Sequence, residues 1–155
     1  MVLDPNVGGV EVVHLGAPVG PLERSALVAP IPEAGTDHLA PLTVLPEAGA
    51  GWGGRPGISA HRNGQAVYPR LGPAIVHHDD HHVRAVADDP ATGIAVTIDC
   101  RLDAFGVLVL QAEIENLGGP LTLDEVLLTV PAPHATELMQ LAGRWSDEFH
   151  AVRSA

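Results

Sequence analysis

The sequence predicts an all-β protein, an antiparallel β-sandwich with little helix. The second half of the chain contains successive strand-like stretches in which apolar and polar residues alternate: residues 83–87, 93–102, 106–116 and 121–130. Short turns separate them at a spacing of roughly ten residues, and the chain shows neither alternating helices and strands nor an internal repeat. This pattern is typical of a meander within a sandwich. We therefore expect helix in under about a tenth of the chain, against about a third in an average soluble protein.

The stretch 106–116 shows the alternation most clearly. Its side chains divide between two faces, with Leu108, Leu110, Ala112 and Ile114 on one and Gln111, Glu113 and Glu115 on the other. One apolar and one polar face predict an antiparallel strand that is buried on one side only. In the preceding stretch the only cysteine, Cys100, shares a face with Ile94, Val96 and Ile98. We expect it to be a small buried hydrophobic residue and not a reactive thiol.

The first half of the chain is less regular. Residues 9–15 predict a short strand. Residues 16–46, rich in proline, glycine and alanine, predict a long connection with one short strand at 42–44. Such long connections inside a compact domain are usually functional or packed against a partner. The only helix that the sequence allows is a short one, at residues 135–141.

The composition indicates one domain with enough apolar residues for a core. A chain of 155 residues that is 46% hydrophobic is long enough to bury a core and too apolar to be disordered. The net charge of −11 argues against nucleic acid or an anionic membrane as a partner, because both favour clustered cations. We find no disulfide framework, no signal peptide and no apolar run near the roughly 20 residues of a spanning helix. We therefore expect a cytoplasmic location.

Residues 77–82, which read HHDDHH, are the first candidate for a metal site. Histidine and carboxylate side chains are accepted ligands of zinc and nickel. In an extended strand these side chains would alternate between two sides, with about 6–7 Å between neighbours on one side. A single ion would then require the segment to curl, so we expect a solvated loop between strands and no cofactor. A small metalloenzyme is the less favoured alternative, with His77, His78, His81 and His82 as weak ligand candidates.

No catalytic residue can be assigned from the sequence. It contains no G-x-S-x-G nucleophile motif, and no glycine cluster joins a strand to a helix as in phosphate and dinucleotide sites. Neighbouring acidic residues such as Asp88 and Asp89 carry little information in so acidic a chain, and a solvated turn is the favoured interpretation.

The glycine-rich segment 49–70 contains the remaining candidates, Trp52, Arg55, His61 and Arg62. An indole ring can stack on the apolar face of a sugar, and an arginine guanidinium can bind hydroxyl or carboxylate groups. The alternative is structural: Trp52 would cap one end of the sandwich, while Arg55 and Arg62 would pair with nearby acidic residues. Residue chemistry alone does not separate these hypotheses. In the same segment, Asn63 followed by Gly64 predicts a hairpin turn.

Two motifs resemble a known family. Residues 121–145 form a predicted strand that runs into the pattern P-x-P-x-A-T-E-L-x-x-L-x-G-R-W. This resembles the close of the N-terminal β-sandwich domain in family 36 glycoside hydrolases, the microbial α-galactosidases, where it leads towards the catalytic barrel. Residues 45–62 fit L-P-E-x-x-x-G-W-x-G-R-P-G-[IL]-x-x-H-R, which resembles a loop in one branch of the same family.

The resemblance implies a supersandwich-like N-terminal domain over residues 1–145, closed by the exit motif Gly143, Arg144 and Trp145. Residues 146–155 would then be an exit segment or tail, with the catalytic barrel absent. In this family both catalytic aspartates belong to the barrel, so the chain alone is expected not to be an enzyme. Its expected roles are scaffold, oligomer contact and rim of the active site. The candidates for the substrate rim or interface are Trp52, Arg55, His61 and Arg62.

The resemblance also implies partners. These are the catalytic barrel or a neighbouring subunit of an α-galactosidase, in a homo-oligomer, with galactosides as further candidate ligands. The alternative is a free-standing carbohydrate-binding or interaction module, which would be marked by affinity for sugar without any barrel.

Overall fold

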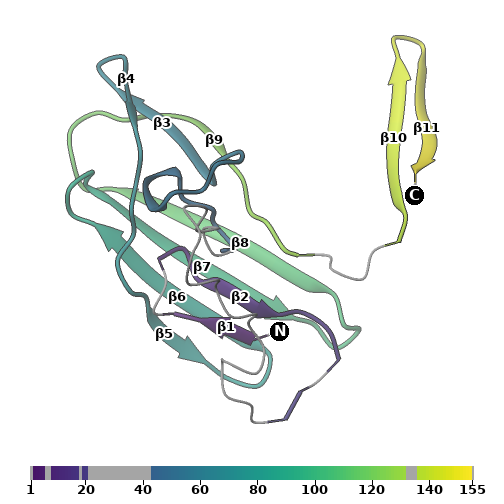
Figure 1. Ribbon diagram of the computed structural model, residues 1–155, viewed down its shortest axis with the longest axis horizontal. Helices are drawn as coiled ribbons and strands as arrows, with labels where there is room; N and C mark the ends of the chain where they lie inside the picture. The colour runs from purple at the N-terminus through teal and green to yellow at the C-terminus, as the bar shows by residue number, and fades with distance from the viewer. Residues whose placement is uncertain (1, 6–7, 18, 21–42, 132–135, 155) are drawn as a thin grey trace, which may run out of the picture.

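The computed structural model describes residues 2–5, 8–17, 19–20, 43–131 and 136–154. In this part of the chain the regular structure is antiparallel strands and a single 3-10 turn, η1 (Ala48–Ala50), which confirms the all-β prediction (Figure 1). Among the described residues, no helix has the length and apolar character to cross a membrane.

The largest sheet has four strands in the order β5-β6-β7-β8. They are β5 (Ile75–His78), β6 (His82–Asp89), β7 (Ile94–Leu102) and β8 (Leu108–Asn116). Strands β6 to β8 are the meander predicted over residues 83–116, and along β8 half-buried and exposed side chains alternate as expected. Strand β5 was not predicted, because its last residues belong to the histidine run that indicates a loop.

The fourth predicted strand lies elsewhere. Residues 122–126 form β9 (Thr122–Val126), but β9 pairs with β3 (Ile58–Arg62) and not with β8. A second sheet of order β4-β3-β9 results, in which β4 (Gln65–Val67) pairs with β3 around Asn63 and Gly64. Both turn residues have positive φ, 50° and 77°, so the predicted hairpin turn is confirmed.

A two-stranded sheet and one buried segment complete the layer that packs on the four-stranded sheet. Strand β1 (Val2–Asp4) pairs with β2 (Glu11–His14), and both lie over the four-stranded sheet (Figure 1). All five residues of segment 43–47 are buried. The N–H groups of Val44 and Leu45 donate to the carbonyls of Val10 and Gly9, just before β2, and Thr43 forms an isolated bridge with Glu11. Residue 42, part of the predicted strand 42–44, lies outside the described residues.

Both layers contribute to one apolar core. Its buried members are Val10, Val12, Val44, Leu45, Ile58, Ala60, Leu71, Ala85, Ala87, Ile94, Val96, Ile98 and Cys100. Cys100 is buried beside Ile98, as predicted, and burial, together with the charge of Asp99, raises the pKa of its thiol to about 11. The thiol is therefore protonated at neutral pH, which fits a packing role.

The short helix that the sequence allowed at residues 135–141 does not form in the part that the structure describes. Residues 138–144 form β10 (Leu138–Arg144), which pairs with β11 (Asp147–Ser154) in a hairpin. The segment contains good helix formers, but pairing with β11, from Leu138 with Ser154 to Arg144 with Asp147, overrides local propensity. Every residue of both strands is exposed, and among the described elements β10 and β11 contact only each other (Figure 1).

Candidate functional site

Residues 51–57, here called the Trp52 loop, begin and end at the same buried segment. At its start, the main-chain carbonyl of Glu47 accepts hydrogen bonds from the N–H groups of Ala50 and Trp52, both at 3.1 Å. At its end, the N–H of Gly57 donates to the carbonyl of Pro46 at 2.6 Å. A side chain at Gly57 would collide with Leu45, because an added Cβ would lie 2.8 Å from its Cγ. The core therefore fixes both ends of the loop.

The indole of Trp52 folds back over this loop. Its Nε1–H donates to the carbonyl of Arg55 at 3.1 Å, and the ring is half-buried. Gly54 lies against the ring, since an added Cβ would be 2.8 Å from Nε1. Trp52 is thus a structural part of its own loop with one side accessible, and it is not a member of the sandwich core.

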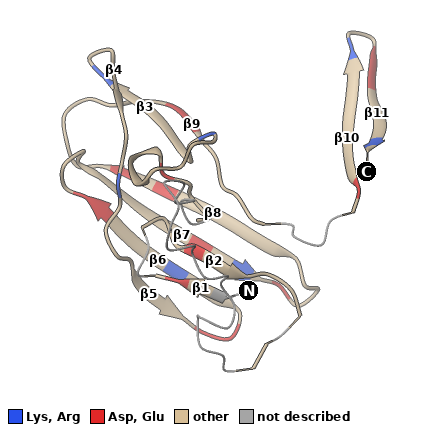
Figure 2. Ribbon diagram, in the orientation of Figure 1, with Lys and Arg blue, Asp and Glu red and all other residues tan. Residues whose placement is uncertain are grey.

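Arg55 is joined to β9 by a two-pronged ion pair. Its Nε and Nη2 donate to the two carboxylate oxygens of Glu125 at 2.9 and 2.7 Å. Figure 2 shows the basic position of the loop beside the acidic positions of β9. The arginine side chain is nevertheless 69% exposed. Its guanidinium is held in one orientation while most of its surface faces solvent.

His61 and Arg62 tie β3 to its surroundings. The Nδ1 of His61 lies 3.0 Å from a carboxylate oxygen of Asp124 on β9. Arg62 donates to the side-chain carbonyl of Asn116 at 2.7 Å and to the main-chain carbonyl of Gly119 at 3.4 Å. These last contacts hold the turn between β8 and β9. Through this turn the chain passes from the large sheet to β9, the partner of β3.

Of the four candidates, Arg55 and His61 therefore contact β9, Arg62 contacts the turn that precedes it, and Trp52 bonds its own loop. The pairing of Arg55 with an acidic residue agrees with the structural hypothesis drawn from the sequence. The partners of Arg62 are the side-chain amide of Asn116 and the main-chain carbonyls of Gly93 and Gly119, so for this residue that hypothesis gave the wrong kind of partner. Neither observation tests whether the exposed side of the loop also serves as a rim or an interface.

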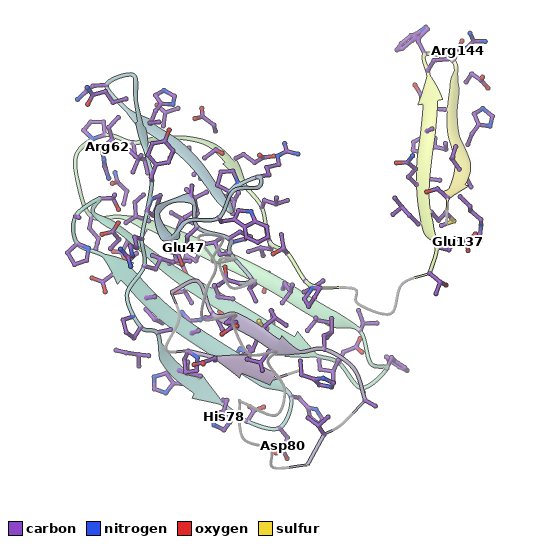
Figure 3. All side chains as sticks on the ribbon, viewed as in Figure 1. Glu47, Arg62, His78, Asp80, Glu137 and Arg144 are labelled. Atoms are coloured by element: carbon purple, nitrogen blue, oxygen red, sulfur yellow. The ribbon has the colours of Figure 1, made fainter. Side chains whose placement is uncertain are left out.

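The histidine run 77–82 covers the end of β5, the turn at residues 79–81 and the first residue of β6, so only part of it is the loop that we expected. A carboxylate oxygen of Asp79 accepts the N–H groups of His81 and His82, both at 2.8 Å, and the first of these bonds lowers the pKa of Asp79. The Nε2 of His82 bonds the carboxylate of Asp99. Within the described ranges, no three His, Cys, Asp or Glu side chains are placed to hold a metal ion. This turn lies at the opposite end of the sandwich from Arg62 (Figure 3).

The exit motif occupies the tip of the outer hairpin. Gly143 and Arg144 end β10, and Trp145 stands in the turn with 90% of its surface exposed. An added Cβ at Gly143 would lie 2.6 Å from the Cα of Glu148, so the two strands approach each other too closely for any other residue. The close approach of the two strands therefore explains why the motif has a glycine at this position.

Sequence reasoning missed Glu47, a residue that is only 6% exposed. One of its oxygens accepts the N–H of Leu71, and the other, Oε1, has no hydrogen-bond partner among the described residues. Burial raises the pKa of this carboxyl. The signal in the sequence was a glutamate at the end of segment 43–47, which is otherwise mostly apolar.

Another buried acid, Asp89, has hydrogen bonds to both of its carboxylate oxygens. It accepts hydrogen bonds from the N–H groups of Arg70 and Ala91 and from the hydroxyl of Thr92, at 2.8 to 3.0 Å. Although burial opposes it, these bonds lower the pKa of Asp89. Asp89 is therefore an anion that the fold satisfies, in contrast to Glu47.

Residues 8–155 match the N-terminal domain of glycosyl hydrolase family 36. The chain belongs to this family, as its two motifs predicted. It is also 29% identical over 137 residues to an α-galactosidase of Escherichia coli. The aligned region is 86% of this chain and 19% of the relative, so the chain spans about a fifth of that protein. No solved structure matches the chain.

Proposed function

We propose that this chain is the non-catalytic N-terminal domain of a retaining α-galactosidase, with hydrolysis of terminal α-galactosides taking place in a catalytic barrel outside it. Family membership and the E. coli relative support this assignment. Retaining hydrolysis requires two carboxyl groups about 5–5.5 Å apart beside a sugar site. The buried carboxyl of Glu47 lines a cavity of about 10 Å³, which has room for about one water molecule and not for a sugar ring.

The Trp52 loop is the contact that this domain offers to the rest of the enzyme. The observation that carries this proposal is Arg55, which is 69% exposed although both oxygens of Glu125 hold it. A side chain ordered before binding loses less conformational entropy when a partner arrives. Tryptophan and arginine are also enriched among the residues that dominate interface energies.

The partner surface is either the rim of the barrel's sugar site or a neighbouring subunit of a homo-oligomer. His61 and Arg62 belong to the same surface through their contacts with β9 and the turn before it. In both cases the sandwich acts as a scaffold that holds the loop in position. The proposal gives the loop no chemical role.

Paired substitutions test this function. Trp52→Ala and Arg55→Ala would be made in this chain and at the aligned positions of the E. coli α-galactosidase. We expect loss of assembly or of α-galactoside turnover in the full-length enzyme and a nearly unchanged melting point in the isolated chain. Arg101→Ala is the matched control, because Arg101 is also exposed but bonds Gln111 on the large sheet. Unfolding of the isolated chain by Trp52→Ala, or unchanged assembly and turnover in the full-length variants, would contradict the proposal.

A further inference from the structure

The side chain of Glu47 lies at the junction of three chain segments in the interior of the sandwich (Figure 3). Its Oε2 accepts the N–H of Leu71, which follows β4. Its Oε1 faces the turn before β2, where an added Cβ at Gly8 or Gly9 would lie 2.8 Å from this oxygen. The main chain of both glycines therefore packs directly against the carboxyl group.

Oε1 is buried without a hydrogen-bond partner among the described residues, and two carbonyl oxygens lie close to the glycines that pack against it. The point where Gly8 would carry a Cβ is also in contact with the carbonyl oxygen of Leu71, and the corresponding point at Gly9 lies 2.5 Å from the carbonyl oxygen of Leu45. The hydroxyl of Thr43 is near as well, but it donates to the Leu45 carbonyl at 2.8 Å. An ionised Oε1 would lack a donor here, whereas a protonated one could itself donate to a carbonyl.

The two charged groups that act on Glu47 oppose each other. Burial raises its pKa most, and the hydrogen bond from Leu71 lowers it; the negative charge of Asp89 then raises the pKa and the positive charge of Arg70 lowers it. Arg70 is exposed, so its charge is screened by solvent. Apart from Glu47, the described residues that line the adjoining cavity are apolar: Leu45, Pro46, Ala48, Ile58, Pro69 and Leu71. Asp89, unlike Glu47, has donors for both of its carboxylate oxygens, so of these two acids Glu47 is the one that the surroundings favour in the protonated form.

The same residue holds the Trp52 loop through its main chain, since its carbonyl accepts the N–H groups of Ala50 and Trp52. We propose that Glu47 is kept as a neutral carboxylic acid and is the positioning residue of this loop. Its Oε1–H donates to the carbonyl of Leu71 or Leu45 and fastens the Gly8 turn, Leu71 and the loop to one another. When the proton is lost to solvent, a charge faces those carbonyls and the junction loosens. The inference deepens the proposed function by linking proton binding to the partner surface.

The test uses the full chain carrying Trp145→Phe, so that Trp52 is the only tryptophan. Its fluorescence and the unfolding equilibrium constant are followed from pH 5 to 9 for Glu47, Glu47→Gln and Glu47→Ala. A group whose pKa is raised by folding stabilises below its unfolded pKa, near 4.5, and that stability is lost as pH rises through the folded pKa. We expect the unfolding constant of the parent to increase by up to about tenfold per pH unit within this window. Trp52 emission should change over the same range.

Glu47→Gln separates this proposal from a merely structural role, because its amide N–H can donate to the carbonyl at every pH. It should keep the parent's low-pH Trp52 emission and abolish the pH dependence, while Glu47→Ala shifts the emission throughout. The infrared C=O stretch of a protonated carboxyl should persist in the parent above the pH at which an ordinary glutamate ionises and be absent in Glu47→Gln. A missing band, or a pH dependence that survives in Glu47→Gln, would overturn the inference. These readouts need only the isolated chain, so their failure leaves the assembly test of the proposed function standing.

Discussion

Arg55 and Glu125 are 70 residues apart in the sequence and are joined by two hydrogen bonds of 2.9 and 2.7 Å. This pair fastens the Trp52 loop to β9 and gives the exposed guanidinium a fixed orientation. The pair therefore fixes the arrangement of the surface that the proposed function uses, at the place where the loop meets β9.

A double-mutant cycle measures what this pair contributes to folding. We expect Arg55→Ala and Glu125→Ala to couple by about 1 kcal/mol or less, because exposed ion pairs are screened by water and salt. The free energies of unfolding of the parent, both single variants and the double variant give the coupling. A value of several kcal/mol would assign Arg55 to structural support and weaken its role as a partner contact.

Cys100 should be unreactive in the folded protein. Burial raises the pKa of its thiol to about 11, and only the thiolate is an effective nucleophile. At pH 8 a thiol reagent should modify the native chain slowly and the denatured chain at once. Rapid modification without denaturant would show that the core opens at β7.

Removal of metal should leave stability unchanged. In the turn 77–82 the carboxylate of Asp79 already accepts main-chain N–H groups, and His82 bonds Asp99. A ligand that binds the native state alone raises its melting temperature, so a chelator should cause no shift. A fall of several degrees that one equivalent of zinc reverses would establish a metal site in this run.

The strands from β6 to β8 could be predicted because each carries its own alternating pattern and short turns connect them. The partner of β9 could not, because alternation predicts which face of a strand is buried but not which strand lies beside it. Whether residues 138–144 form a helix or a strand was decided by β11, a contact that no local pattern contains. The length and the alternation of a segment therefore predicted the strand itself better than they predicted the strand with which it pairs.

For the candidate site, too, the residues could be predicted from the sequence but their contacts could not. A glycine-rich loop with Trp52, Arg55, His61 and Arg62 stood out by composition, but the contacts that order it come from Glu125, Asp124 and Asn116, distant in sequence. Glu47 was missed because a glutamate is ordinarily a surface residue. Its burial follows from the packing of segment 43–47 between β2 and the loop.

The claim that catalysis lies outside this chain is tested most directly by incubating the purified chain with a chromogenic α-galactoside. The account predicts release of chromophore at the rate of the buffer alone, with the full-length E. coli α-galactosidase as the positive control. Turnover that survives repurification of the chain would show that it contains its own catalytic carboxyl groups, and would contradict the account.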